Sequence, residues 1–304
     1  MNQHLAKNEV YGKTRSLLLV FLAYVLALVA AVATYPFVDH LSPFWSALAM
    51  DVSATVVIWA VGANVRNASL YDPYWSVIPP AFVAFWWAGT GYDLAPGKVM
   101  MAIVVVYWAV RLTSNWARDW PGLHHEDWRY QEMRENSGKM YQFSNLFGIC
   151  LFPTALVFLG MLPMWPVLTG GGSSNLIIDI VAFVIGMGAV TIQLFSDGQM
   201  RNFRFKKQEN MTNQAFYTDG LWAWSRHPNY FGEVAMWFSL WVFAMSAGFE
   251  HYWTGIGWIA MLALFLFVSC PWMDRRSAAK RPGYAEHIKT SNLFFMTPPR
   301  KAKG

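Results

Sequence analysis

Two pairs of polar residues in this chain are spaced so that their side chains share one face of a helix. Asn115 and Arg118 are three positions apart, and Asn229 and Glu233 are four positions apart. Residues at these separations are neighbours on a helix surface. If helices run through these positions, each pair presents an amide and a charged group to the same side.

A third pair and a predicted helix start add charge of both signs. Asp197 and Arg204 are seven positions apart, which is about two helical turns. Proline favours the first position of a helix, so Arg226-His227-Pro228-Asn229 is predicted to begin one. A helix start carries unpaired N–H groups and partial positive charge, and Arg226 adds a full charge. The sequence therefore predicts a site for a phosphate or carboxylate there.

The elements that must position these residues are predicted to be membrane-spanning helices. Apolar residues make up 55% of the chain and charged residues only 13%, against roughly 25% charged in an average soluble domain. This composition excludes an ordinary soluble globule, a coiled coil and a disordered chain. A bilayer core of about 30 Å needs about 20 apolar residues per helix. Such runs occur at residues 17–35, 44–63, 74–90, 98–113, 146–168, 176–196, 230–248 and 252–271. We therefore predict an all-α polytopic bundle of about eight transmembrane helices.

The distribution of charge predicts the orientation of these spans. Helix-ending signals separate the runs, among them Gly170-Gly171-Gly172-Ser173-Ser174. Eight spans place both termini on one side, and by this scheme that side holds every Lys and Arg except Lys98. Basic residues concentrate in cytoplasmic loops, so both termini are predicted to be cytoplasmic. The net charge of +5 then reflects topology and does not indicate nucleic-acid binding.

Ionisable residues gather at the cytoplasmic ends of the runs, where we predict that they face one chamber. An ionisable group at membrane depth costs energy and is therefore a candidate functional group. Asp72, which opens the third run, is one of these. Two acids inside runs, Asp51 and Asp179, are interpreted instead as hydrogen-bonding groups between helices.

No metal site is predicted. His124-His125-Glu126 is not accompanied by a second histidine cluster, so we interpret it as a solvated loop. Cys150 and Cys270 lie within apolar runs and form neither a disulfide framework nor a thiolate site.

The run Leu221-Trp222-Ala223-Trp224-Ser225-Arg226-His227-Pro228-Asn229-Tyr230-Phe231-Gly232-Glu233 resembles the signature of a known family. These are bacterial membrane proteins of DUF1295, with a steroid 5-alpha-reductase-type C-terminal domain. The resemblance covers about residues 65–300, including the closing Arg281-Pro282-Gly283-Tyr284. Residues 1–64 then form an N-terminal transmembrane pair whose first helix is an addition. The resemblance favours a bacterial inner membrane over the endoplasmic reticulum.

The resemblance implies a membrane-embedded reductase that uses NADPH to transfer hydride to an activated C=C of a lipid or steroid-like enone. The family's cofactor-binding pairs match Asn115 with Arg118, Asp197 with Arg204, and Asn229 with Glu233. Arg226 and His227 are expected in the same cofactor site, where the arginines hold phosphates. The steroid reductases have an acid before a proline that helps to polarise the substrate carbonyl, and it matches Asp72 before Pro73.

Two departures from the family pattern concern the substrate end. The acid is Asp where the steroid reductases have Glu, so it is shorter by a methylene. Their partner tyrosine falls on Val104, so Tyr107 or Tyr74 is expected to assist Asp72. Hydride transfer puts negative charge on the carbonyl oxygen, and a donor aimed at that oxygen lowers the barrier.

Two other functions remain open. Arg226-His227-Pro228 and the basic tail are also similar to isoprenylcysteine carboxyl methyltransferases and phospholipid methylating enzymes, which use S-adenosylmethionine. A fold does not fix a function, so a non-catalytic lipid- or sterol-binding membrane protein is the third candidate. All three predict a hydrophobic small molecule or lipid as ligand, no nucleic acid and no obligate protein partner.

Overall fold

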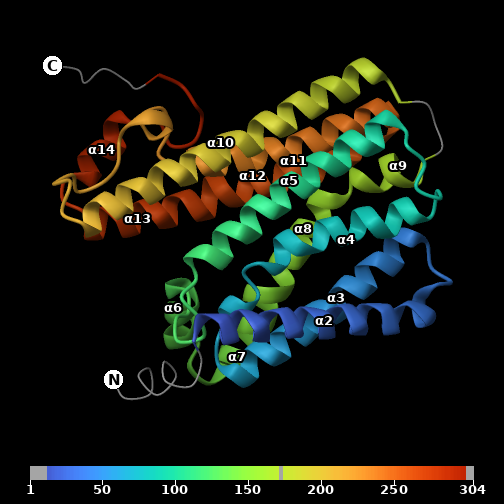
Figure 1. The fold of residues 1–304 in the computed structure, drawn as a ribbon, viewed down its shortest axis with the longest axis horizontal. Helices are drawn as coiled ribbons and strands as arrows, with labels where there is room; N and C mark the ends of the chain where they lie inside the picture. The colour runs from blue at the N-terminus through green and yellow to red at the C-terminus, as the bar shows by residue number, and fades with distance from the viewer. Residues whose placement is uncertain (1–11, 171–173, 299–304) are drawn as a thin grey trace. The chain divides into compact units, whose positions relative to one another are not determined.

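The computed structural model of the chain describes residues 12–170 and 174–298, and all regular structure within them is helical, without a strand (Figure 1). The centre of the predicted Gly170–Ser174 turn and the end of the basic tail lie outside the described residues. The chain divides into two units. Unit 1 comprises Met1–Asp93 and Trp108–Phe158, and unit 2 comprises Leu94–Tyr107 and Leu159–Gly304.

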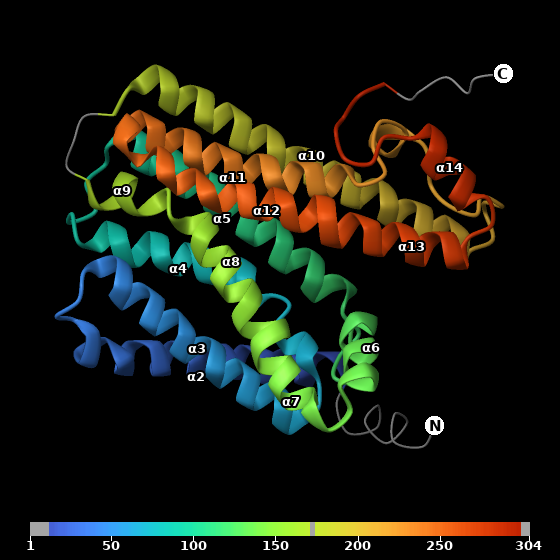
Figure 2. The same ribbon diagram turned by 180° about the vertical axis from the view of Figure 1, so that it is seen from behind.

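Unit 1 is built on the helical hairpin of α2 (Lys13–Val38) and α3 (Pro43–Val65), which lie side by side (Figures 1 and 2). Pro43 stands at the start of α3, where its missing N–H costs nothing, and Arg66 ends the helix in a left-handed conformation with φ 55°. The other elements of this unit are η1 (Ala68–Leu70), α4 (Tyr74–Ala88), the second half of α5 (Pro96–Asp119), α6 (Trp128–Ser137), η2 (Gly138–Met140), α7 (Tyr141–Ser144), the π-helix η3 (Asn145–Leu151) and most of α8 (Phe152–Met161).

Unit 2 is built on α10 (Leu176–Gln208) and α11 (Pro228–Ala247), which pack along each other (Figures 1 and 2). Gly232 permits this packing, because a Cβ there would lie 2.7 Å from the Ala189 carbonyl oxygen. The other elements are the first half of α5, α9 (Met164–Thr169), η4 (Gly220–Ala223), η5 (Phe249–Gly255), α12 (Ile256–Leu264), the π-helix η6 (Phe265–Ser269), α13 (Cys270–Lys280) and α14 (Tyr284–Thr290).

The chain is a multi-pass membrane protein by the length and composition of its helices. Among the described residues, 6 helical stretches are long and apolar enough to span a bilayer: Lys13–Val38, Pro43–Val65, Pro96–Asp119, Trp128–Met161, Leu176–Gln208 and Phe249–Lys280. Two predicted runs, at residues 74–90 and 230–248, form the helices α4 and α11, which are not among these stretches. The count of eight spans and the cytoplasmic termini stay predictions.

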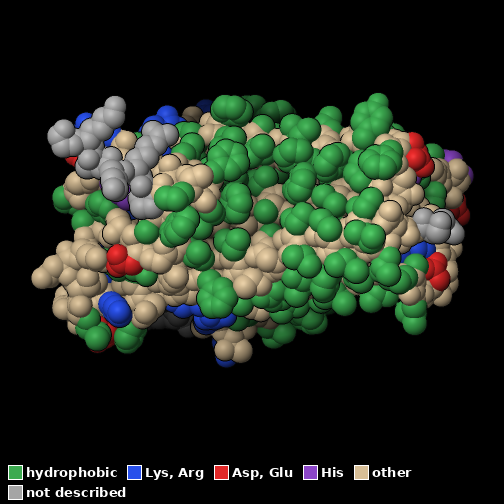
Figure 3. Space-filling view, turned by 90° about the horizontal axis from the view of Figure 1, so that it is seen from above, with side chains coloured by type: hydrophobic (Ala, Val, Ile, Leu, Met, Phe, Trp, Pro, Cys, Tyr) green, Lys and Arg blue, Asp and Glu red, His purple; other side chains and the backbone are tan. Residues whose placement is uncertain are grey.

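The surface carries the apolar side chains that a lipid environment requires. Figure 3 shows a face covered largely by hydrophobic side chains, with charged side chains mainly towards its margins. On α10, for example, Ile177 is 74% exposed, Val184 63% and Phe195 61%. A continuous apolar cover of this kind in a water-soluble monomer would be an aggregation hazard.

A close approach between α12 and α8 predicts a strong effect of one methyl group. A Cβ on Gly257 of α12 would lie 2.0 Å from the carbonyl oxygen of Leu159, whereas a Cβ on Gly188 of α10 would meet nothing within 4 Å. We expect Gly257→Ala to lower the free energy of unfolding by about 1–3 kcal/mol. Gly188→Ala, the matched control, should change it by less than about 1 kcal/mol. Unfolding of each variant in detergent micelles by added dodecyl sulfate measures both, and equal stability of the two variants would contradict the close contact.

Candidate functional site

Asp72 of unit 1 forms a hydrogen-bonded pair with a tyrosine that sequence analysis did not select. Asp72 follows η1 and precedes Pro73, the residue before the first turn of α4. The hydroxyl of Tyr130, on α6, donates to Asp72 Oδ1. Burial raises the pKa of the Asp72 carboxyl to about 7, although the Arg129 charge and the Tyr130 hydrogen bond act in the opposite direction. Asp72 therefore exchanges its proton near neutral pH.

The pKa of a neighbouring carboxyl, that of Asp127, is shifted in the opposite direction. Burial alone would raise the pKa of Asp127, but Arg129 outweighs burial and holds that pKa below its usual value. Arg129 Nε lies 2.8 Å from Asp127 Oδ1, and the Arg129 backbone N–H also donates to this oxygen. Two nearby acids whose pKa values are pushed apart can take different roles, one holding a proton and one remaining charged.

Polar contacts fix the segment that carries Asp72 against the loop before α6. The Asn67 side chain donates to the carbonyl oxygens of Leu123, at 3.0 Å, and His125, at 2.9 Å. In return, the backbone N–H of Asp127 donates to Ser69 Oγ at 2.9 Å. These hydrogen bonds join the segment that carries Asp72 to the segment that precedes Tyr130.

Glu126 contributes to the same junction. His124-His125-Glu126 is a loop, as interpreted, and His125 is exposed, but Glu126 is not solvated. The Glu126 side chain is only 12% exposed. It accepts hydrogen bonds from the Ala68 backbone N–H at 2.8 Å and from Arg134 Nη2 at 2.8 and 2.9 Å. The sequence pattern did not reveal this, because the partners of Glu126 lie 58 and 8 positions away.

Of the two tyrosines predicted to assist Asp72, Tyr74 contacts a different acid, and the part of Tyr107 stays a prediction. The hydroxyl of Tyr74 donates to Asp51 Oδ1 at 2.7 Å, which connects α4 to α3. This bond confirms the interpretation of Asp51 as a hydrogen-bonding group between helices. Tyr107 belongs to unit 2, whereas Asp72 belongs to unit 1.

In unit 2, Arg226 is bound by protein groups around a second buried acid, Asp274 of α13. Arg226 Nε lies 3.0 Å and Nη2 2.9 Å from Asp274 Oδ2, and both side chains are at most 9% exposed. Arg226 Nη1 donates to the carbonyl oxygens of Ile288 at 3.1 Å and Ser291 at 2.7 Å. Its guanidinium therefore ties the start of α11 to α13 and to the end of α14.

The other oxygen of Asp274 accepts two more hydrogen bonds. His227 Nε2 lies 3.1 Å and the Tyr284 hydroxyl 3.0 Å from Asp274 Oδ1. Burial, with the Asp274 charge second, raises the pKa of Tyr284, so this hydroxyl keeps its proton and donates. The His227 ring also stacks on Tyr230, with centroids 5.3 Å apart and planes at 7°. Asp274 thus orients both residues of the Arg226-His227 pair.

The remaining predicted residues lie on helices, as their spacing predicted. Helix α11 begins at Pro228, as predicted, and carries Asn229 and Glu233 one turn apart. Glu233, 4% exposed, accepts from Trp237 Nε1 at 3.2 Å. Asp197 and Arg204 both lie on α10, and Asn115 and Arg118 both lie on the part of α5 that belongs to unit 1. A single pocket formed by all these residues stays a prediction.

Tyr130, Asp274 and Tyr284 are the interacting residues that sequence reasoning did not assign to a site. Asp274 lies in the run Pro271–Arg276, and Tyr284 closes the motif Arg281-Pro282-Gly283-Tyr284. The closing motif was a signal that could have found Tyr284. No spacing rule relates Asp274 to Arg226, because the two are 48 positions apart and meet only in the folded chain.

Comparison with known proteins shows the family. Residues 58–291 match the model of the family described as "Protein of unknown function (DUF1295)", which is more than half of the chain. The protein therefore belongs to the DUF1295 family, as its Leu221–Glu233 motif predicted. The family match does not test the predicted domain boundary between residues 64 and 65, which stays a prediction.

A relative of the chain is known from a yeast. The chain is 26% identical over 281 residues to the uncharacterized protein C594.04c of Schizosaccharomyces pombe, which covers 85% of this chain and 81% of the relative. The bacterial origin that the resemblance implied is therefore not borne out, and the predicted bacterial inner membrane stays a prediction. No solved structure matches the chain.

The three hydrogen bonds and the ion pair on Asp274 predict a large stability effect. We expect Asp274→Ala to lower the free energy of unfolding by about 3–5 kcal/mol, because it leaves the buried Arg226 charge without its partner. Glu286→Ala, the control, removes the exposed ion pair with Lys289 and should cost less than about 1 kcal/mol. Chemical unfolding in detergent followed by circular dichroism measures both. A loss below 1 kcal/mol in Asp274→Ala would show that the pair is not needed for the fold.

Proposed function

We propose that this protein is a membrane-embedded, NADPH-dependent reductase that transfers hydride to an activated C=C of a lipid or steroid-like enone. The observation that carries the proposal is the pair of Asp72 and Tyr130. The resemblance to steroid 5-alpha-reductases implies an acid with a partner tyrosine. Asp72, the residue before Pro73, is the proposed acid, and Tyr130 is the proposed partner. Membership of the DUF1295 family supports the same class of fold.

The chemistry of the side chains on α10 and α11 fits a nicotinamide dinucleotide. Asp197 and Glu233 offer carboxylates for ribose hydroxyls, Asn229 offers an amide for the nicotinamide carboxamide, and the exposed Arg204 offers a guanidinium for phosphate. These four residues belong to helices that pack together within unit 2. The cofactor contacts predicted for Asn115 and Arg118, on the part of α5 that belongs to unit 1, stay predictions.

Arg226 and His227 take a different part in the proposed site. The Arg226 guanidinium already contacts Asp274, Ile288 and Ser291. We therefore assign Arg226 the role of a positioning residue, which holds the start of α11 and the ring of His227 in place, and we assign the cofactor phosphate to Arg204.

NADPH, when bound, supplies the hydride. The chain's contribution lies at the substrate carbonyl, where the protonated carboxyl of Asp72 donates a hydrogen bond to the oxygen that becomes negative. Tyr130 fixes the orientation of that carboxyl through Oδ1. Such a donor acts most strongly where water is scarce, because it is already oriented before charge develops. The hydride adds to the β-carbon of the enone, and the α-carbon then takes a proton from solvent, which restores the neutral carbonyl.

The pKa of Asp72 predicts the pH dependence of this reaction. Because the donor is the protonated carboxyl and its pKa is raised to about 7, kcat/KM should be constant below about pH 7 and fall tenfold per pH unit above it. Asp72→Asn should lower kcat by about 10²–10³-fold and abolish this alkaline limb. The measurement is NADPH oxidation at 340 nm with a lipid enone across the pH range.

Tyr130→Phe provides a second readout of the same pair. The Tyr130 hydrogen bond lowers the pKa of Asp72, so its removal should move the alkaline limb to higher pH while kcat falls. Tyr74→Phe is the control, because Tyr74 donates to Asp51 and should leave the limb unmoved. An unchanged profile in Tyr130→Phe would contradict the pairing of Tyr130 with the catalytic acid.

The cofactor assignment predicts the effect of removing two donors. In the double variant Arg204→Ala with Asn229→Ala, NADPH affinity should fall by about 30–1000-fold, since each charged or amide contact is worth about 1–2 kcal/mol. Arg275→Ala removes an exposed charge from α13 and should leave affinity unchanged. Calorimetric titration of the purified protein in detergent measures both, and unchanged affinity in the double variant would end this assignment.

The same titration separates the other candidate functions. Binding of S-adenosylmethionine without binding of NADPH would identify a methyltransferase. Binding of NADPH without its oxidation by any lipid enone would indicate a lipid- or sterol-binding protein that has lost the chemistry.

A further inference from the structure

The guanidinium of Arg129 is bound by Asp127 and not by Asp72, the acid of the proposed reaction. Arg129 Nε lies 2.8 Å from Asp127 Oδ1, and Arg129 Nη2 lies 3.2 Å from Asp127 Oδ2. Both oxygens of one carboxylate thus bind the same guanidinium, which is the strong, bidentate form of this ion pair. Asp72 accepts instead from the hydroxyl of Tyr130, and within residues 12–170 and 174–298 no hydrogen bond or ion pair joins it to Arg129.

The start of α6 fixes Asp127 in this place. Asp127 is the N-cap of the helix, and its Oδ1 accepts from the backbone N–H of Arg129 at 2.9 Å. The backbone N–H of Asp127 donates to Ser69 Oγ at 2.9 Å, in the segment that leads to Asp72. Asp127 therefore has two separable tasks. Capping the helix needs only an oxygen acceptor, whereas binding the guanidinium strongly needs a negative charge.

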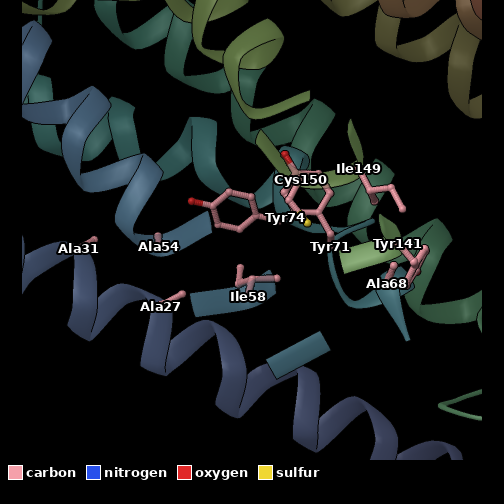
Figure 4. Close-up of a cluster of buried hydrophobic side chains, with 10 residues drawn as sticks. All are labelled: Ala27, Ala31, Ala54, Ile58, Ala68, Tyr71, Tyr74, Tyr141, Ile149 and Cys150. Carbon is pink, nitrogen blue, oxygen red and sulfur yellow. The ribbon is translucent and has the colours of Figure 1, made fainter. Parts of the chain in front are cut away.

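Tyr130 brings Arg129 and Asp72 together. The Cζ atom of Arg129 lies 5.6 Å from the centroid of the Tyr130 ring, and the hydroxyl of the same ring donates to Asp72. The ring packs against the buried cluster that includes Tyr71 and Cys150, which Figure 4 shows. The Arg129 side chain, by contrast, is 43% exposed. Its guanidinium is therefore able to turn from Asp127 to Asp72 when Asp127 no longer holds it.

The two charges near Asp72 act on it in opposite directions. Burial raises the pKa of the Asp72 carboxyl, the Arg129 charge lowers it and the Asp127 charge raises it. Further titratable groups that interact with Asp72 are Tyr24, Tyr71, Tyr130 and Cys150. Tyrosine and cysteine ordinarily ionise above neutral pH, so these groups add no charge there. The protonation of Asp72 thus depends on the balance between Arg129 and Asp127.

We propose that Asp127 is a positioning residue that holds the Arg129 guanidinium away from Asp72, so that Asp72 keeps the proton with which it acts as a donor. When Asp127 loses its charge, Arg129 pairs with Asp72 instead, because a guanidinium binds an ionised carboxylate strongly. A paired Asp72 carboxylate only accepts hydrogen bonds and has no proton to donate. The donor role of Asp72 rests on the proposed function, whereas the competition of the two acids for Arg129 does not.

Infrared spectroscopy of the purified full-length protein in detergent tests this competition without cofactor or substrate. The C=O stretch of a protonated carboxyl disappears when the group ionises, and the band that is missing in Asp72→Asn identifies Asp72. In Asp127→Asn the midpoint of this band should move to lower pH by about 1–2 pH units. Asn retains an oxygen that caps the helix but carries no charge. An unchanged midpoint in Asp127→Asn would overturn the proposal, since it would leave Asp127 with the capping task alone.

Removal of the cation separates this competition from simple repulsion between the two acids. Arg129→Met should move the midpoint to higher pH, and adding Asp127→Asn to it should no longer cause the large downward shift, because no guanidinium remains to pair with Asp72. An equal downward shift with and without Arg129 would show repulsion alone and contradict the proposal. Glu132→Gln, which removes an exposed charge of α6, is the control and should leave the midpoint unchanged. Asp127→Ser, a second neutral N-cap, replaces Asp127→Asn in the event that the latter does not fold.

Enzyme activity distinguishes a failure of this inference from a failure of the proposed function. In a reductase, the alkaline limb of kcat/KM should move with the infrared midpoint in each variant. Shifted midpoints in a protein that oxidises NADPH with no lipid enone would refute the reductase and support the competition for Arg129. Oxidation of NADPH together with a constant midpoint in Asp127→Asn would support the reductase and refute the competition.

Discussion

The structure depends on one constraint, that a carboxyl group removed from water must find its hydrogen bonds within the protein. Asp274 shows the complete solution, with Arg226 on one oxygen and His227 and Tyr284 on the other. Through these bonds the start of α11, the helix α13 and the segment after it are held together. A charge at this position is costly in isolation, so its partners organise the chain around it.

Asp72 and Asp51 of unit 1 meet the same constraint only in part. Asp72 has a tyrosine partner and a nearby guanidinium, and its pKa is close to neutral. Asp51 has a tyrosine partner and no cation among the described residues. A carboxyl with every hydrogen bond made holds the fold, whereas one that still has a proton to exchange or donate can act on another molecule. The three acids therefore differ in their hydrogen bonds and in the charges around them, although the residue type is the same.

The helices could be predicted because their cause is local. The apolar runs require helices, and Pro228 and the charges around it place the start of α11. The pairs on α5, α10 and α11 followed from helical spacing alone. The partners of the acids could not be predicted in this way. Tyr130 and Asp72 are 58 positions apart, and Asp274 and Arg226 are 48 positions apart. No helical spacing relates residues at such separations, so the sequence pattern does not predict these contacts.

The prediction of an anion site at Arg226 illustrates this limit. A helix start and an arginine are the elements of such a site, and both are present. The guanidinium is nevertheless turned to Asp274 and to carbonyl oxygens near the end of α14. An arginine next to a membrane has two ways to satisfy its donors, either with an anionic ligand or with acceptors of its own chain. The sequence shows the donors of Arg226. Whether they bind a ligand or the protein depends on Asp274, which is 48 positions away and comes close only in the folded chain. Arg204 has an exposed guanidinium instead, and this difference in environment is why we assign cofactor phosphate to Arg204 and the support of His227 to Arg226.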